Sequence, residues 1–151
     1  MEQRPLQIAS GRQPFQVAIM VASVFLGLAL TITDRVPNSA AKTMHPAVLN
    51  AWVGMLLLAG TLALVGVFWS GAFRTALRLE TAGVLMLAGG SSMYAVAVFS
   101  VSGWAALIAG GYTTAIAFGC WWRAYQLVRD VRKLAHAGVA RLPVLVEEEI
   151  P

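Results

Sequence analysis

The longest stretch without Asp, Glu, Lys or Arg runs from Thr81 to Trp122, forty-two residues between Glu80 and Arg123. One membrane crossing needs about 20 apolar residues, because the hydrocarbon core of a bilayer is about 30 Å thick. The stretch is therefore long enough for two crossings. The turn-forming residues Ser100 to Gly103 lie near its middle. We predict a transmembrane hairpin with spans at 81–100 and 104–122.

Two further stretches, Gln13 to Thr33 and Thr43 to Phe73, also lack these charged residues, and they predict spans at 15–33 and 49–70. Only 12% of the chain is charged and 58% is hydrophobic, whereas soluble domains carry roughly 25% charged residues. A soluble helical bundle would need polar faces on helices that are apolar all round. We therefore expect an all-α fold, an integral membrane four-helix bundle, with residues 1–151 forming a single membrane domain.

The basic residues favour one side of this topology. One predicted side carries Arg4, Arg12, Arg74, Arg78, Arg123, Arg129, Arg132, Lys133 and Arg141, and the other carries only Arg35 and Lys42. Cytoplasmic loops of membrane proteins are enriched in Lys and Arg, so both termini are expected in the cytoplasm of a multi-pass protein of the cell membrane. Orientation also explains the net charge of +4 without a nucleic-acid partner.

The fourth span is expected to continue as a helix beyond the membrane. In residues 123–137, apolar residues recur on one helical face, as in Leu127, Val128, Val131 and Leu134, while charged residues occupy the rest. This pattern predicts a cytoplasmic amphipathic extension that lies along the inner leaflet. We expect the remaining residues, 138–151, to form a flexible tail.

Tryptophan spacing supports the positions of the spans. Trp52 and Trp69 bracket one span, and Trp104 and Trp121 bracket another, each pair seventeen residues or about 25 Å apart along a helix. Such an aromatic belt marks the headgroup level. The neighbouring arginines either fix the topology alone or also bind anionic lipid headgroups of the bilayer. The predicted membrane-interface residues are Trp52, Trp69, Trp104, Trp121, Trp122, Arg74, Arg78, Arg123, Arg129, Arg132 and Lys133.

No predicted span contains Asp, Glu, Lys, Arg or His. Ion-coupled transporters, proton pumps and intramembrane enzymes usually need such groups at membrane depth. His45 and His136 fall on opposite predicted sides, so they cannot share a metal ion, and the only cysteine, Cys120, has no His or carboxylate nearby at depth. We therefore expect a non-enzymatic protein with no catalytic residues, no metal site and no cofactor.

Small residues recur every four positions on several spans, where they allow helices to approach closely. These predicted helix-packing residues are Ser23, Gly27, Thr31, Ala88, Ser92, Gly111, Ala115 and Gly119. They serve either packing within the chain or self-association of several copies, and the sequence leaves both open.

Several short segments resemble small four-span membrane proteins of actinobacterial phages and prophages. They are Val36-Pro37-Asn38-Ser39, Arg78-Leu79-Glu80 before a Gly-rich span with Tyr94, and Trp121-Trp122-Arg123-Ala124, and they place the resemblance over about residues 36–134. Several such proteins are thought to be holins, which assemble in the inner membrane and open lesions that release a cell-wall hydrolase. The resemblance implies a holin-like homo-oligomer and brings no catalytic residue with it.

Two other functions remain open. The chain has the features of a structural or accessory subunit whose helices pack with partners in a larger membrane complex. A small-molecule transporter is the third hypothesis.

Overall fold

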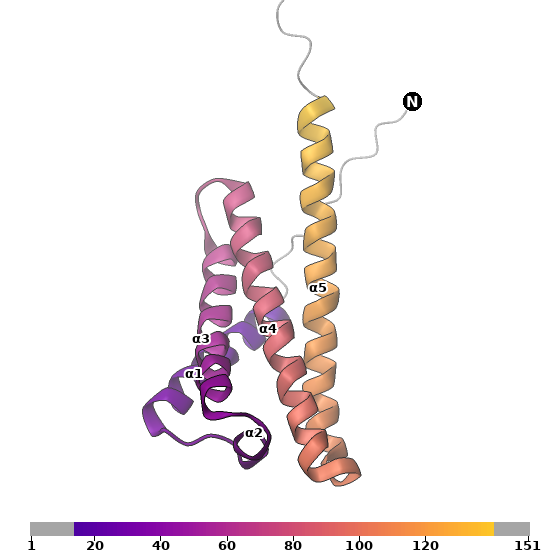
Figure 1. Cartoon of the computed structure of the whole chain (residues 1–151). Helices are drawn as coiled ribbons and strands as arrows, with labels where there is room; N and C mark the ends of the chain where they lie inside the picture. The colour runs from indigo at the N-terminus through magenta and orange to yellow at the C-terminus, as the bar shows by residue number, and fades with distance from the viewer. Residues whose placement is uncertain (1–13, 141–151) are drawn as a thin grey trace, which may run out of the picture.

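The computed structural model describes residues 14–140, and within them the side-chain environments of all but Phe73 and residues 134–140. This part of the chain is helical and contains no strand. The elements follow in the order α1 (Pro14–Thr33), α2 (Asn38–Thr43), α3 (Pro46–Phe68), α4 (Phe73–Ser102), the 3₁₀ turn η1 (Gly103–Ala106) and α5 (Leu107–Ala140) (Figure 1). The all-helical class predicted from the sequence is thereby confirmed.

Local sequence signals account for the helix boundaries. Pro14 is the first residue of α1, where its missing N–H costs no hydrogen bond. Asp34 follows α1 with a φ of 50°, a left-handed conformation that ends the helix. The side chain of His45 accepts a hydrogen bond from the backbone N–H of Ala47 at 3.3 Å, and Pro46 is the first residue of α3. α1 and α3 therefore begin where proline is favoured.

The turn between α4 and α5 lies where the sequence places it. α4 ends at Ser102, and Gly103 has a φ of 48°, which a residue with a side chain rarely adopts. After the four residues of η1, α5 runs back antiparallel to α4 (Figure 1). The expected hairpin is present, with helices longer than the predicted spans at both outer ends.

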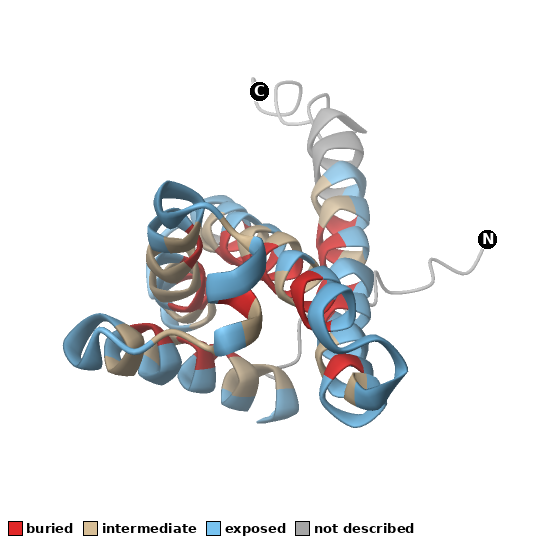
Figure 2. Cartoon of the chain, turned by 60° about the horizontal axis from the view of Figure 1, so that its bottom comes forward, coloured by how far each residue is buried: buried red, intermediate tan, exposed pale blue. Residues whose placement is uncertain are grey.

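The four long helices form a row. α1 packs on α3, α3 on α4 and α4 on α5, whereas no Cα of α1 comes within 8 Å of a Cα in α4 or α5. The short helix α2 lies against α4, with Ala40 fully buried. Buried residues lie where helices face one another, and the outward faces of the helices are exposed (Figure 2). The predicted four-helix bundle is therefore not confirmed, because the row leaves outer faces of α1 and α5 without a helical neighbour.

Glycines set the contact distances within the row. A Cβ built on Gly60 of α3 would lie 2.8 Å from the carbonyl oxygen of Met20 in α1, and one on Gly83 of α4 would lie 2.6 Å from that of Ala59 in α3. Real Cβ atoms essentially never come so close, so glycine at both positions lets neighbouring backbones touch. The buried core runs between these contacts and includes Met20, Ala63 and Leu87.

α5 continues without interruption to Ala140, so a helix through residues 123–137 is present. Its apolar face is used differently from the prediction. Leu127 is buried in the same core cluster as Leu77 of α4, and Val131 packs against that cluster. At Leu127 and Val131 this face contacts α4 and is not free to lie on a lipid surface. The expected tail at 141–151 lies outside the described residues.

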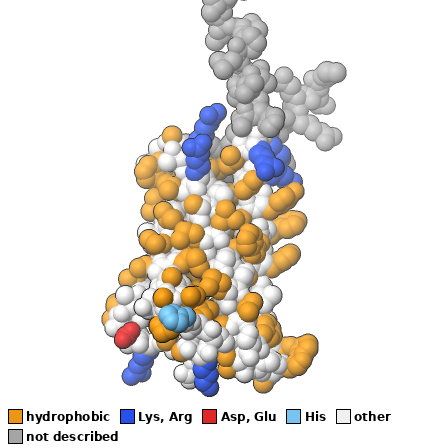
Figure 3. Space-filling model, in the orientation of Figure 1, with side chains coloured by type: hydrophobic (Ala, Val, Ile, Leu, Met, Phe, Trp, Pro, Cys, Tyr) orange, Lys and Arg blue, Asp and Glu red, His pale blue; other side chains and the backbone are white. Residues whose placement is uncertain are grey.

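Three helical segments are long and apolar enough to cross a membrane: Pro14–Thr33, Pro46–Phe68 and Arg74–Lys133. The third has 60 residues and folds back at Gly103, so it contains both arms of the α4–α5 hairpin. Hydrophobic side chains cover the visible flank, while Lys and Arg side chains gather at the two ends (Figure 3). This architecture is compatible with a membrane protein.

Candidate functional site

The most distinctive polar arrangement is a buried ion pair that joins α4 to α5. The carboxylate Oε1 of Glu80 lies 2.8 Å from Nη2 of Arg123 and accepts a second, longer hydrogen bond from its Nε at 3.3 Å. The side chains are only 8% and 9% exposed, respectively. Opposite charges that are both removed from water stabilise one another strongly only when their geometry is good, and this pair has two donors on one oxygen.

α1 contributes a third member to this cluster. The side-chain amide of Gln16 donates to the same Oε1 of Glu80 at 2.9 Å. On the fourth side, Gly66 of α3 lies against the backbone of Glu80, and a Cβ there would be 2.8 Å from the Cα of Glu80. Residues of all four long helices therefore meet at Glu80, and this makes the cluster the polar junction of the fold.

Arg123 was predicted among the residues that face the headgroups, but it lies inside the protein. Glu80 was treated only as the border of the uncharged stretch. The missed signal is the symmetry of that stretch: when a 42-residue hairpin folds at its middle, the charged residues that flank it come to the same height. Glu80 and Arg123 can pair only if both side chains also point between α4 and α5. The spacing of residues along the two helices does not reveal this orientation.

A second cluster lies between α3 and α4 around Trp52. Its indole N–H donates to the carbonyl oxygen of Gly90 at 3.0 Å, and its ring stacks on that of Tyr94 with a centroid separation of 5.3 Å. Trp52 is 4% exposed. It was predicted at the membrane interface, but the structure buries it in the contact between α3 and α4.

The other predicted interface residues lie on the surface. Trp104 is 87% exposed, and Trp69, Trp121 and Trp122 are about half exposed. Exposed basic side chains are Arg74, Arg78, Arg129, Arg132 and Lys133. These positions are consistent with contact to a bilayer.

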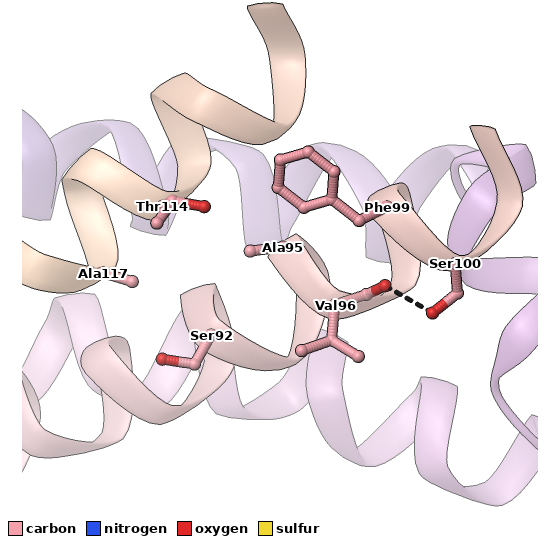
Figure 4. Close-up of a pocket in the computed structure, with 7 residues that line it drawn as sticks. All are labelled: Ser92, Ala95, Val96, Phe99, Ser100, Thr114 and Ala117. Atoms are coloured by element: carbon pink, nitrogen blue, oxygen red, sulfur yellow. Dashed lines mark hydrogen bonds between the residues drawn. The ribbon is translucent and has the colours of Figure 1, made fainter. Parts of the chain in front are cut away.

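An open groove of about 550 Å³ runs between α4 and α5 (Figure 4). It is lined by Ser92, Ala95, Val96, Phe99, Ser100, Thr114 and Ala117. The three hydroxyl groups donate to carbonyl oxygens one turn earlier on their own helices, as Ser100 does to Val96 at 2.7 Å. The indole of Trp121 donates to the Ser92 hydroxyl at 3.2 Å. The groove is thus a largely apolar surface whose hydroxyl protons are already bonded.

The predicted helix-packing residues separate into two groups. Ser23 and Gly27 face α3, where a Cβ on Gly27 would lie 2.9 Å from the backbone nitrogen of Leu57, and Ala88 is buried in the core. Ser92 is partly buried, and Thr31 is exposed with its hydroxyl bonded to the carbonyl oxygen of Gly27. These residues, Thr31 apart, serve contacts within the chain.

The stripe on α5 lies on its outer face. Gly111, Ala115 and Gly119 are exposed, and a Cβ built on Gly111 or Gly119 would meet nothing within 4 Å. Packing within the chain, one of the two readings that the sequence left open, therefore does not account for this stripe.

Within the described range, no three His, Cys, Asp or Glu side chains are grouped so that they could hold a metal ion. Cys120 is free and buried. No family model matches the chain, and neither the curated proteins nor the solved structures include one that is significantly similar to it.

Proposed function

We propose that the chain is a non-enzymatic membrane protein that crosses the bilayer four times, with both termini in the cytoplasm, and that acts by assembling with further copies of itself. The length of the α4–α5 hairpin supports four crossings, because each of its two arms is counted as one. The nine-to-two distribution of basic residues supports the orientation.

The observation that carries self-assembly is the outer face of α5. Lipid tails are as apolar as Leu, so helices associate in a bilayer through close packing, and small residues permit this packing. Gly111, Ala115 and Gly119 offer such a surface and have no partner helix within the chain. Exposed large apolar residues, including Ile108 and Phe118, flank the stripe and would border the contact.

A holin-like lesion former is the first candidate, because the resemblance to four-span phage proteins and an unoccupied association face both favour it. An accessory subunit of a larger complex is the second, since the same face fits a helix of another protein. A transporter is third: the groove between α4 and α5 is apolar, and the buried charges Glu80 and Arg123 neutralise each other.

Inducible expression in a bacterial host tests the proposal. The lesion former should cause loss of membrane potential and viability at a defined time, together with oligomers trapped by chemical crosslinking. Ala115→Leu should abolish both while the protein still inserts, because a large side chain prevents close approach of the helices. Ala22→Leu, an exposed alanine on α1, is the matched control and should behave as the wild type.

The outcomes separate the candidates. If oligomers vanish in Ala115→Leu and the wild type never affects growth, lesion formation is refuted and the accessory role is favoured. If Ala115→Leu leaves the oligomers intact, self-assembly through this face is refuted.

A further inference from the structure

We propose that the cytoplasmic end of the α4–α5 hairpin is a binding surface for anionic phospholipids, formed by Arg74 and Arg78 of α4 with Arg129 and Lys133 of α5. The proposal uses the membrane orientation given above. It does not depend on self-assembly or on lesion formation.

Among the described residues, the acidic side chains at this end are buried, whereas most of the basic side chains are exposed. The described part of the chain has acidic residues at Asp34, Glu80 and Asp130. Glu80 and Asp130 belong to the cytoplasmic end, and both are buried, with Glu80 paired to Arg123. The surface around them therefore displays basic side chains and no carboxylate among the described residues. The opposite end differs, because exposed Asp34 lies beside Arg35.

The Glu80–Arg123 contact gives a common reference level from which the positions of these cations along α4 and α5 can be counted. Glu80 and Arg123 are in contact, and the two helices run antiparallel. Arg74 and Arg129 each lie six residues beyond the pair toward the cytoplasm, which is about 9 Å at the rise of an α-helix. By the same measure Arg78 is about 3 Å and Lys133 about 15 Å beyond the pair. The four cations thus lie at increasing distances from the pair along two adjacent helices. Basic side chains are visible at this end in Figure 3.

Exposed aromatic residues place the membrane boundary at the level of the pair. Phe15 is adjacent to Gln16, and Trp122 is adjacent to Arg123; both are exposed, as is Tyr125. Trp and Tyr side chains, such as Trp122 and Tyr125, concentrate at the membrane interface. The headgroup layer is about 5 to 8 Å thick on each side of the hydrocarbon core. Arg78, Arg74 and Arg129 therefore lie within or at the edge of the layer that contains lipid phosphates, and Lys133 can reach it with its long side chain.

The chemistry favours lipids with a net negative charge. Guanidinium groups bind phosphate oxygens through paired, charge-assisted hydrogen bonds. A phosphatidylcholine phosphate carries its own compensating cation, whereas phosphatidylglycerol does not. A net-negative headgroup should therefore be enriched next to this surface.

Quenching of tryptophan fluorescence by brominated lipids measures this enrichment. The full-length protein is reconstituted into vesicles in which either phosphatidylglycerol or phosphatidylcholine carries the bromine, with identical composition in both leaflets so that orientation has no effect. Trp104, at the opposite end, is replaced by Phe in every sample, so that Trp69, Trp121 and Trp122 dominate the exposed signal. The test variant combines Arg74→Gln, Arg78→Gln, Arg129→Gln and Lys133→Gln. The matched control combines Arg35→Gln and Lys42→Gln at the other end.

We expect stronger quenching by brominated phosphatidylglycerol than by brominated phosphatidylcholine in the starting protein. In the test variant, the ratio of quenching by phosphatidylglycerol to quenching by phosphatidylcholine should fall at least about fivefold. This is the factor that a single cation at a membrane surface contributes. The control should keep it within about twofold, and 0.5 M salt should weaken it through screening. Equal quenching by both lipids, or an equal loss in the control, would overturn the proposal. If neither lipid quenches the fluorescence, the protein is not in the membrane as proposed. This outcome differs from equal quenching by both lipids, which would show only that the surface has no lipid preference.

Discussion

The carboxylate of Glu80 and the guanidinium of Arg123 are 2.8 Å apart, although the residues are 43 positions apart in the chain. Between them the chain leaves on α4, turns at Gly103 and returns on α5. Their contact closes the open end of this hairpin, and Gln16 links α1 to the same oxygen. This polar cluster therefore connects α1, α4 and α5, in addition to the hydrogen bonds that Trp52 and Trp121 donate across helix contacts.

Removing one partner of this pair should destabilise the protein more than removing both. Glu80→Gln or Arg123→Gln leaves a buried charge without its counter-charge, and such changes cost about 3 to 5 kcal/mol. The double variant Glu80→Leu/Arg123→Met removes both charges of the pair and should be closer to the wild type. Denaturation by SDS in mixed micelles gives the free energies of unfolding. Arg129→Gln, at an exposed position, is the control. Strictly additive losses would show that the two side chains are not coupled.

Gly83 and Gly89 on α4 offer a matched pair for testing close packing. A Cβ on Gly83 would collide with the backbone of α3, whereas one on Gly89 would meet nothing within 4 Å. Gly83→Ala should cost about 1 to 3 kcal/mol through overpacking. Gly89→Ala should be neutral or slightly stabilising, because alanine favours the helix by up to about 1 kcal/mol. The free energies of unfolding of the two variants check this, and similar values would contradict the arrangement of α3 on α4.

Trp52→Phe removes the indole donor that bonds the carbonyl oxygen of Gly90. The lost hydrogen bond should cost about 1 kcal/mol, and the smaller ring should add a further loss of packing. Trp104→Phe, at an exposed position, should change the stability by less than about 0.5 kcal/mol. Near-ultraviolet circular dichroism during thermal unfolding follows both variants. An equal shift of the midpoint in both would argue against a buried Trp52.

Cysteine labelling tests the orientation in the membrane. In a Cys120→Ala background, Asn38→Cys should react with a membrane-impermeant maleimide added to intact cells, while Thr75→Cys should react only after the cells are opened. Both positions are exposed, so access to the reagent depends on the side of the membrane. The reverse pattern would show that the termini are external.

Helix positions were predictable because they depend on the length of apolar stretches. Residues 15–33 were expected to be helical and α1 spans Pro14–Thr33. Of the turn expected at Ser100 to Gly103, only Gly103 lies in the observed turn, because α4 continues to Ser102. α2 was missed, since six residues are too few to show a helical period. The helix through 123–137 was expected, but its apolar face proved to contact α4.

Rotation of each helix about its own axis was not predictable from spacing. The spacing of the tryptophans predicted the position of Trp52 along the helix axis. Only tertiary packing determines that its ring points toward Tyr94. The same limit applies to the small-residue stripes. The stripe with Gly27 faces a neighbour and the stripe with Gly111 does not, although both show the same four-residue repeat.

The row of helices has a consequence for biosynthesis. Every long helix packs on the helix that precedes or follows it among the long ones. Short separations along the chain make such contacts quick to form, because little loop entropy is lost. During synthesis, each of these long helices is therefore followed or preceded directly by a helix on which it packs. The last of the described helices, α5, carries Arg123, which completes the junction at Glu80. The junction at Glu80 can thus form only after Arg123 has been synthesised.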